Sequence, residues 1–230
     1  WFGTAGFIDP HRLRIERSDD LVEHTADFVV IACGTVPARP SHIPFDDHSI
    51  IDTDGLLTLK TLPKSITIIG GGVIGAEYAS ILATMGIHVT LIERRSRLLE
   101  FVDQETIEAL QYHMRSIGVT LRFNEEVVSV ERQPQEQVIV RLKSGKEIAA
   151  TTVLYSVGRT GASATLNLEA IGLTADDRGR LKVNEHYQTT VPHIYAAGDI
   201  IGFPALASTS MQQGRHAACH AFGIPCQTQS

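Results

Sequence analysis

The sequence has 230 residues and a formal net charge of −6, from 20 lysines and arginines against 26 aspartates and glutamates. This acidic balance, with an isoelectric point near 5.9, argues against a nucleic acid as partner. The hydrophobic fraction of 43% and the mean hydropathy of +0.03 exclude wholesale disorder. A chain of this length can bury a sizeable core, so we expect one large or two modest domains.

The cysteines and the apolar stretches exclude two further classes of protein. Cys33, Cys219 and Cys226 have neither the spacing of a zinc site nor the number needed for a disulfide framework, so we expect reduced thiols, no metal and a cytoplasmic location. The apolar run over residues 66–89 approaches the length of a membrane span, but it contains charged and polar residues and a glycine turn. An α/β unit explains it better, and no membrane is expected as partner.

The chain begins with strands. Residues 1–27 alternate polar and apolar side chains between turn residues, which predicts a short antiparallel meander. Residues 28–33 are apolar and end at Gly34, which predicts a buried strand. The prolines that follow cannot donate to a ladder, so that strand must stop there. A short capped helix is expected at Thr53, ahead of Pro63.

The stretch over residues 65–80 organises the rest of the chain. A β-branched strand runs into three glycines in G-x-G-x-x-G spacing, Gly70, Gly72 and Gly75, and a helix over 73–85 follows. Gly70 would permit a tight turn, Gly72 would let the backbone approach a pyrophosphate, and Gly75 would allow close packing of helix on strand. The pattern predicts nucleotide binding, and a glycine-rich turn without a ligand is the alternative.

The residues after the glycines strengthen this prediction. The helix would begin at Val73 and Ile74, where free backbone N–H groups can face an anion. A second strand, residues 87–92, ends at Glu93, 18 residues after the third glycine, where a carboxylate can accept hydrogen bonds from ribose hydroxyls. Glu93 favours NAD(H), because the 2′-phosphate of NADP(H) would meet a carboxylate. Three nearby arginines could neutralise that phosphate or could simply lie on a solvated loop: Arg94, Arg95 and Arg97.

The next elements complete a sheet. A helix expected over 103–117 has apolar residues at helical spacing and leaves Tyr112 and His113 on its exposed flank. A third parallel strand is expected at 119–123, and an antiparallel excursion is expected over 127–149.

Residues 152–157 then return to the parallel sheet. That strand ends at Gly158 and Arg159, and the arginine could face a phosphate or form a surface salt bridge. A further short strand is expected at 181–183.

The segment from Thr190 to Asp199 is the most specific one in the chain. An apolar strand there ends in Ala-Gly-Asp, which places Asp199 at the carboxyl edge of a sheet, able to hold sugar or ribitol hydroxyls. A helix expected soon afterwards would face a pyrophosphate. A strand followed by an aspartate cap is the alternative.

Together these motifs resemble the flavoprotein disulfide reductases that bind two dinucleotides. The resemblance covers essentially the whole chain, and the glycine motif, the Gly158-Arg159 strand end and the Thr190 to Asp199 segment follow the family's order. Residues 28–34 match the family's strand ending in Ala-Thr-Gly, with cysteine in place of threonine. Within the family, residues 158–161 and 198–207 are most similar to the transhydrogenase branch.

This resemblance implies an FAD-dependent oxidoreductase that transfers hydride between NADPH and NAD⁺, without a side-chain acid or base. FAD, NAD(H) and NADP(H) would be its cofactors and substrates. Glu77 would lie near the nicotinamide, Asp199 would bind the FAD ribitol, and the backbone at Leu206 and Ala207 would stabilise charge on reduced flavin. The expected cofactor-binding residues are Gly34, Gly70, Gly72, Val73, Ile74, Gly75, Glu77, Glu93, Arg94, Gly158, Arg159, Gly198, Asp199, Leu206 and Ala207.

The resemblance also implies a domain plan. A Rossmann-like α/β NAD(P)-binding domain with an antiparallel meander, residues 44–157, would be inserted between two parts of a FAD-binding domain, residues 1–43 and 158–230. The family's first FAD fingerprint, redox-active cysteine segment and dimerisation domain are not in the sequence. We therefore expect a middle section of a homo-oligomeric parent, with weak NAD binding, little FAD and no turnover by itself.

Two alternatives stay open. One is dihydrolipoamide dehydrogenase or another disulfide reductase, which a Cys-x4-Cys pair upstream of Trp1 would indicate. The other is a nucleotide-binding or redox-sensing module without catalysis.

Overall fold

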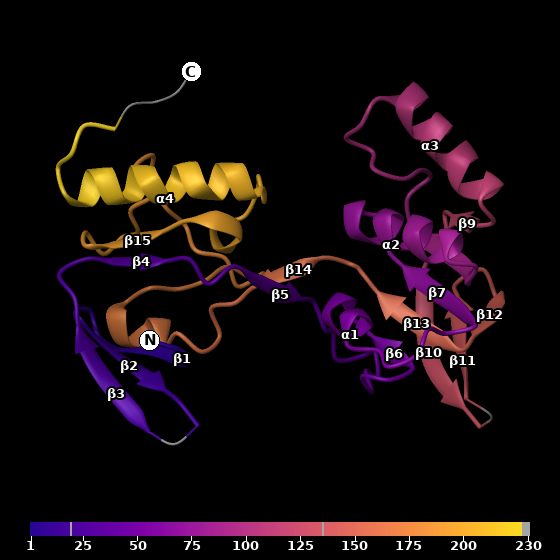
Figure 1. Ribbon diagram of the computed structural model, residues 1–230, viewed down its shortest axis with the longest axis horizontal. Coiled ribbons are helices and arrows are strands. Elements are labelled where there is room, and N and C mark those ends of the chain that lie inside the picture. Colours follow the sequence, from indigo (N-terminus) through magenta and orange to yellow (C-terminus); the bar gives the residue numbers. More distant parts are fainter. Residues whose placement is uncertain (19, 135, 227–230) are drawn as a thin grey trace. The chain divides into compact units, whose positions relative to one another are not determined.

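The computed structural model describes residues 1–18, 20–134 and 136–226. The chain divides into two compact units (Figure 1). Pro37–Gly158 form one, called the inserted unit below, and Trp1–Val36 with Arg159–Ser230 form the other, called the split unit. The corresponding boundaries drawn from the sequence were residues 44 and 157.

A five-stranded parallel sheet forms the centre of the inserted unit. Its strand order is β6 (Ile50–Ile51), β13 (Thr152–Tyr155), β7 (Ser65–Ile69), β8 (His88–Glu93) and β9 (Thr120–Phe123). Every ladder between these strands is parallel, as the sequence predicted for β7, β8, β9 and β13. The chain runs from β7 through β8 to β9 on one side of β7 and then crosses back to β13 on its other side, so the strand order reverses beside β7. Open α/β sheets bind their ligands at such a switch point.

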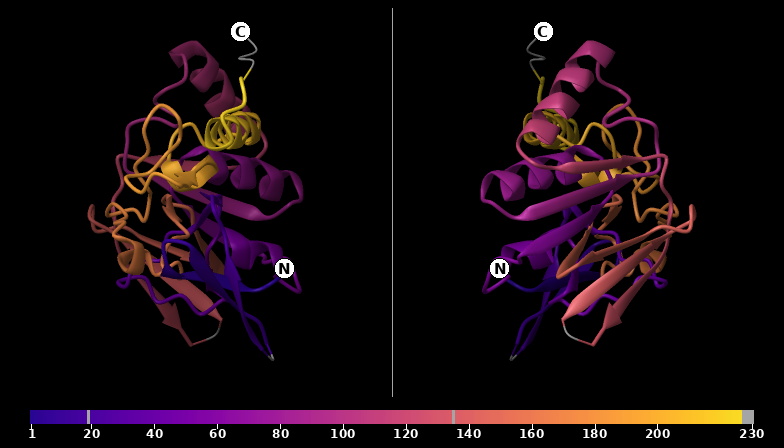
Figure 2. Two further views of the ribbon diagram at one scale, coloured as in Figure 1. Left: turned by 90° about the vertical axis from the view of Figure 1, so that its left-hand side faces the viewer. Right: turned by 90° about the vertical axis from the view of Figure 1, so that its right-hand side faces the viewer.

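Both faces of this sheet are covered. On one face, Ile68 and Leu91 join an apolar cluster with residues of α2 (Val73–Thr84) and α3 (Gln104–Ser116). On the other, Ile69 and Ile92 pack with an antiparallel sheet (Figure 2), made of β10 (Val127–Gln133), β11 (Gln137–Leu142) and β12 (Glu147–Ala150). Burial on both sides explains why apolar residues of β7 and β8 point to both faces of the sheet.

The helix boundaries predicted for the inserted unit are confirmed to within a few residues. Asp52 caps the short α1 (Thr53–Leu57), and Asp103 caps α3 by accepting from the N–H groups of Glu105 and Thr106 at 3.0 and 3.3 Å. Tyr112 and His113 are exposed on α3, as its periodicity predicted. Among the described residues, no helix combines the length and the apolar character needed to cross a membrane.

The split unit is built from smaller sheets. The predicted meander is confirmed in the antiparallel strands β1 (Thr4–Asp9), β2 (Arg12–Glu16) and β3 (Leu21–Thr25). Two strand pairs follow, β4 (Val29–Ile31) with β15 (Ile194–Ala196) in parallel, and β5 (Thr35–Pro37) with β14 (Arg159–Gly161). The other elements are the 3₁₀ turns η1 (Leu168–Ile171) and η2 (Gly198–Ile201) and the helix α4 (Ala207–Ala221).

The strand predicted at residues 181–183 is wrong. Leu181 is buried and its N–H donates to the carbonyl of Ile200 at 3.0 Å, but that carbonyl belongs to η2 and not to a strand. The alternation of Leu181 and Val183 therefore reflects an extended segment packed on the core, without a ladder.

Candidate functional site

The three glycines of the motif have different environments at the end of β7. Gly70 has φ of 107°, in the region that favours glycine, and its N–H donates to the carbonyl of Ile92 at 2.9 Å. A Cβ on Gly75 would lie only 1.9 Å from the Gly70 carbonyl oxygen, so helix and turn touch there. A Cβ on Gly72 would meet no atom within 4 Å. The turn and packing roles predicted for Gly70 and Gly75 are confirmed, and Gly72 faces open space.

Ser156, which the sequence analysis missed, holds this turn from the neighbouring strand. It follows β13, and its Oγ donates to the carbonyls of Ile69 and Gly70 at 2.9 and 3.1 Å. Its N–H also donates to the Ile69 carbonyl, at 2.8 Å. The only sequence signal is that it is the first small polar residue after an apolar strand, at the edge where sheet ligands bind.

Glu93 lies directly against the glycine turn. Its side chain is buried, and Oε2 accepts from the N–H of Gly71 at 2.7 Å. Oε1 accepts from the N–H of Arg95 at 2.9 Å, and the Arg95 guanidinium donates to both oxygens, at 3.0 and 3.1 Å. Burial alone would raise the pKa of Glu93, but these hydrogen bonds outweigh it and hold that pKa below its ordinary value. The carboxylate is therefore ionised at neutral pH.

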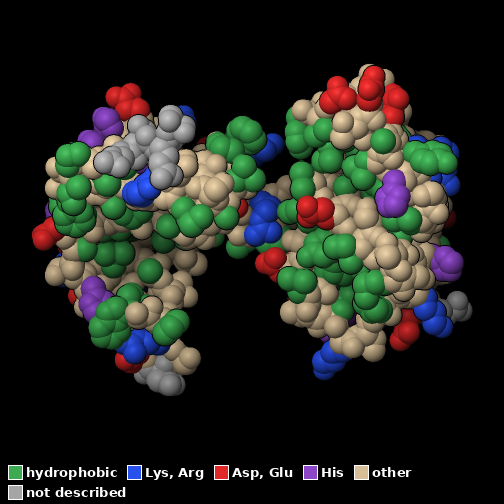
Figure 3. Space-filling model, turned by 45° about the horizontal axis from the view of Figure 1, so that its top comes forward, with side chains coloured by type: hydrophobic (Ala, Val, Ile, Leu, Met, Phe, Trp, Pro, Cys, Tyr) green, Lys and Arg blue, Asp and Glu red, His purple; other side chains and the backbone are tan. Residues whose placement is uncertain are grey.

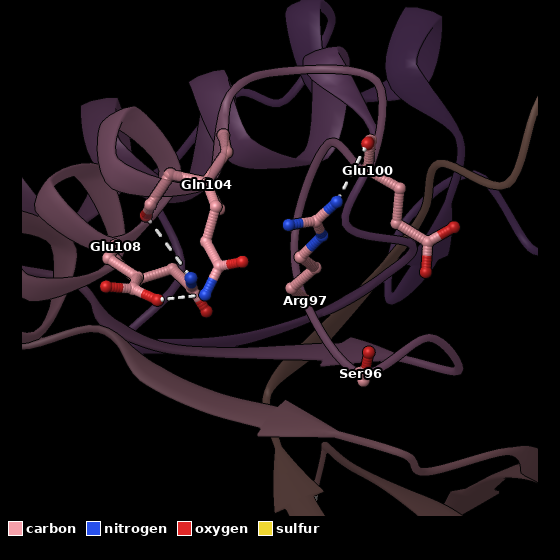
Figure 4. Close-up of a pocket in the computed structure, with 7 residues that line it drawn as sticks. Ser96, Arg97, Glu100, Gln104 and Glu108 are labelled. Carbon is pink, nitrogen blue, oxygen red and sulfur yellow. Dashed lines mark hydrogen bonds between the residues drawn. The ribbon is translucent and has the colours of Figure 1, made fainter.

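The arginines that follow have separate surroundings. Arg94 is exposed, whereas Arg97 donates to the carbonyl of Glu100 at 3.1 Å (Figure 4). Arg97 also borders a cavity of about 760 Å³. The other residues that line this cavity are Ser96, Glu100, Gln104, Ile107, Glu108 and Gln111. Figure 3 shows acidic side chains grouped at one end of this unit. With two glutamates and one arginine in its wall, the cavity does not favour a phosphate.

The helix that follows the glycines begins as predicted. Val73 is the first residue of α2, and Gly72 is its N-cap without a side-chain hydrogen bond. The first N–H groups of such a helix have no partner within it, so Val73 and Ile74 can offer theirs to an anion. Val73 and Glu77 are both exposed on this helix.

A second cavity lies at the carboxyl ends of the parallel strands β4 and β15, within the split unit. It has a volume of about 280 Å³ and is lined by Val30, Ala32, Gly34, Ala197, Gly198, Asp199, Ser210 and Gly214. The structure thus brings together Gly34, Gly198 and Asp199, which the sequence had singled out separately. Within the described part of the chain, no hydrogen bond or ion pair engages the Asp199 carboxylate.

Residues of α4 that sequence reasoning missed complete this cavity. The buried Gln213 accepts from the N–H of Gly198 at 2.8 Å through its Oε1, which ties the Gly198 turn to the helix. Ser210 and Gly214 lie on the same helical face, and their spacing of small and polar residues was the available signal. The helix starts at Ala207 with the exposed Leu206 as N-cap.

Two other predicted residues have structural partners. The Arg159 guanidinium donates to Oγ1 and to the carbonyl of Thr35, both at 2.7 Å, and so joins β14 to β5. Among the described residues no carboxylate pairs with Arg159, so the surface salt bridge is absent, and phosphate binding stays a prediction. Gly158 has φ of 86°, and its carbonyl accepts from the N–H of Ala38 at 3.2 Å.

Both places offer groups that can bind parts of a dinucleotide. The inserted unit offers a turn without side chains, a free helix start and a buried carboxylate, and the split unit offers an unengaged carboxylate beside glycines. By contrast, no cluster of three potential metal-binding acids, histidines or cysteines occurs in residues 1–18, 20–134 and 136–226.

Comparison with known proteins gives consistent results. The chain is 49% identical over 225 residues to a soluble pyridine nucleotide transhydrogenase of Mycobacterium bovis, which covers 97% of this chain and 48% of the relative. A protein of the same name from Klebsiella pneumoniae is 50% identical over 217 residues, covering 94% and 46%. The chain therefore spans about half the length of the curated relatives it matches.

Solved structures show the same fold. LpdA from Mycobacterium tuberculosis matches with a TM-score of 0.91 and 29% identity, over 99% of this chain and 51% of that one. The HOCl-induced flavoprotein disulfide reductase RclA from Escherichia coli matches with a TM-score of 0.88 and 30% identity, over 98% and 51%.

The family model described as pyridine nucleotide-disulphide oxidoreductase matches residues 4–214. This confirms the resemblance deduced from the three motifs. The chain belongs to the pyridine nucleotide-disulphide oxidoreductase family.

Proposed function

We propose that this chain is part of a flavoenzyme that transfers hydride between NADPH and NAD⁺. The observation that carries the proposal is the glycine turn at the switch point of the parallel sheet, with Glu93 bound to it and open space at Gly72. The identity of about half the residues to relatives named as transhydrogenases supports the choice of reaction.

In this proposal the inserted unit binds the nicotinamide dinucleotide. The turn from Gly70 to Gly75 and the N–H groups at Val73 and Ile74 receive the pyrophosphate. Glu93, with Arg94 beside it, faces the adenosine ribose. Glu77, exposed one turn into α2, lies toward the nicotinamide end.

The split unit would form part of the flavin site. Bound FAD would supply the two-electron chemistry that lets hydride pass from one nicotinamide to another. The Asp199 carboxylate would accept hydrogen bonds from ribitol hydroxyls, beside Gly34 and Gly198. The first N–H groups of α4, at Leu206 and Ala207, would favour negative charge through the helix dipole. Such hydride transfer needs no side-chain acid or base.

The assignment of residues 44–157 to an NAD(P)-binding domain, and of 1–43 with 158–230 to a FAD-binding domain, belongs to the same proposal. A homo-oligomeric parent rests on the family resemblance alone, and a cytoplasmic location rests on the cysteine pattern.

The reaction is tested on the chain extended to the full length of its relatives. We expect rapid hydride transfer from NADPH to a chromogenic NAD⁺ analogue, with dihydrolipoamide left unoxidised. Rapid dithiol oxidation with slow NADPH consumption would identify a disulfide reductase instead. NAD(H) binding without any flavin-dependent transfer would identify a nucleotide-binding module.

The flavin site is tested separately through Asp199→Asn. Removing the charge from the acceptor should weaken FAD binding by about tenfold or more, measured as flavin retained after dialysis. Asp177→Asn is the matched control, because Asp177 is exposed in the same unit and lies outside the cavity. Equal flavin content in both variants would remove Asp199 from the proposed site.

A further inference from the structure

The Glu93 carboxylate is fully occupied inside the fold. Each of its oxygens accepts two hydrogen bonds, Oε1 from the N–H and Nε of Arg95, and Oε2 from the N–H of Gly71 and Nη2 of Arg95. A carboxylate has about four acceptor positions. A ribose hydroxyl can therefore be accepted only if one of these donors leaves.

Only one of the donors is free to leave. The four hydrogen bonds come from three donor groups. Two are the backbone N–H groups of Gly71 and Arg95, which the turn fixes in place, and the third is the Arg95 guanidinium at the end of a flexible side chain. The Arg95 side chain is 39% exposed and the Glu93 side chain 7% exposed. The buried carboxylate thus stays in place, and the guanidinium can rotate into solvent or onto a ligand.

In the part of the chain that the structure describes, the neighbouring arginines make no hydrogen bond or ion pair with the Glu93 carboxylate. Arg97 is hydrogen-bonded to the Glu100 carbonyl and borders a cavity that also contains the carboxylates of Glu100 and Glu108. Arg94 is exposed beyond the turn and forms no hydrogen bond or ion pair with Glu93 among the described residues. Arg95 is the cation that already touches the expected ribose-binding carboxylate.

We propose that the Glu93–Arg95 ion pair lets one site accept both NAD(H) and NADP(H), because each ligand opens the pair and takes a different member of it. This inference rests on the proposed function of the inserted unit. With NAD(H), the ribose hydroxyls replace the guanidinium on Glu93, and Arg95 turns to solvent. With NADP(H), the 2′-phosphate draws the guanidinium away from Glu93 and pairs with it in the same forked geometry.

The test is calorimetric titration of the 230-residue chain with ADP-ribose and with 2′-phospho-ADP-ribose, which differ only in the phosphate. Arg95→Gln should weaken the 2′-phosphorylated ligand by about tenfold or more and leave ADP-ribose unchanged or tighter. Glu93→Gln should act in the opposite direction, weakening ADP-ribose and tightening its 2′-phosphate. Its amide oxygen can still accept from Gly71, and circular dichroism checks that each variant is folded.

Two further arginine variants make the test specific. Arg97→Gln removes the competing arginine of the same loop, and Arg115→Gln removes an exposed charge on α3. In both, the ratio of the two affinities should equal that of the parent chain. A ratio that responds to Arg97→Gln and not to Arg95→Gln would overturn the inference.

The outcomes separate this inference from the function on which it rests. If both ligands bind and Arg95→Gln leaves their ratio unchanged, the ion-pair exchange is wrong and the dinucleotide site stands. If neither ligand binds the folded parent chain at millimolar concentration, the proposed function of the inserted unit is itself contradicted.

Discussion

The two units present their candidate sites in different ways. In the inserted unit, a continuous five-stranded sheet positions the glycine turn, and residues after three neighbouring strands meet there: Gly70 after β7, Glu93 at the end of β8 and Ser156 after β13. In the split unit, a parallel pair of three-residue strands carries the cavity, and α4 provides its remaining wall.

This difference shows that the two candidate sites are stabilised by two kinds of contact. The inserted site depends on backbone packed against backbone, with almost no tolerance for an added atom. The split site depends on one side chain, Gln213, which ties a loop to a helix. The units should therefore respond differently to small substitutions.

The largest effect is expected from Gly75→Ala. The added methyl group would lie 1.9 Å from the Gly70 carbonyl oxygen, an overlap that only a backbone shift can relieve. We expect the free energy of unfolding of the inserted unit to fall by more than about 2 kcal/mol, and ADP-ribose binding to be lost. Hydrogen exchange resolved along the chain measures the first and calorimetry the second.

Gly214→Ala gives the matching stability measurement in the split unit. It also lies inside a helix, but its Cβ would meet no atom within 4 Å, so the free energy of unfolding should rise by a few tenths to about 1 kcal/mol. If Gly75→Ala and Gly214→Ala lowered the free energy of unfolding by similar amounts, the expected difference between the two units would be wrong.

Gln213→Met tests the side-chain contact of the split unit. The substitution keeps the size of the side chain but leaves the N–H of Gly198 without its acceptor, which should cost about 1–2 kcal/mol of unfolding free energy. Faster hydrogen exchange at Gly198 is the direct readout. Gln212→Met, on the exposed side of the same helix, is the control and should change neither quantity. An unchanged exchange rate at Gly198 in Gln213→Met would show that the contact is not needed.

The sequence predicted most accurately what depends on neighbouring residues. The glycine spacing, the acid at the end of β8, and Asp103 as helix cap are local patterns, and each occupies its expected place. The pairing of Glu93 with Arg95 was not predicted, because the loop arginines differ only in the direction that the turn gives them. The two hydrogen bonds from the Arg95 guanidinium to Glu93 can be predicted only when the path of the backbone after β8 is known.

Long-range contacts account for the other residues that were missed. Ser156 acts on Ile69, 87 residues earlier, and nothing near Ser156 indicates that partner. Arg159 donates to Thr35, 124 residues earlier, because β14 pairs with β5, and nothing near Arg159 in the sequence indicates that partner. Leu181 alternates like a strand because it is buried on one side, although its hydrogen-bond partner is a turn.

A last prediction concerns a feature that the two units share, a loop closed around one aspartate. Asp46 of the inserted unit accepts from the N–H groups of His48, Ser49 and Ile50, and Asp176 of the split unit accepts from Arg178 and Arg180. Burial alone would raise the pKa of Asp46, but its hydrogen bonds lower it to about 2. The Arg180 guanidinium and the backbone lower the pKa of Asp176, also to about 2.

A pKa that is lower in the folded than in the unfolded chain gives stability that is complete above the unfolded value, 3.8, and is lost as pH falls toward 2. Asp46→Asn should therefore cost about 1 kcal/mol at pH 7, after allowance for solvent screening, and progressively less between pH 4 and pH 2. Asp176→Asn should show the same pH window in the split unit. Urea unfolding across this range, followed by hydrogen exchange in each unit, measures both. A cost that stays constant down to pH 2 would mean that the hydrogen-bonded loop, and not the charge of the aspartate, provides the stability.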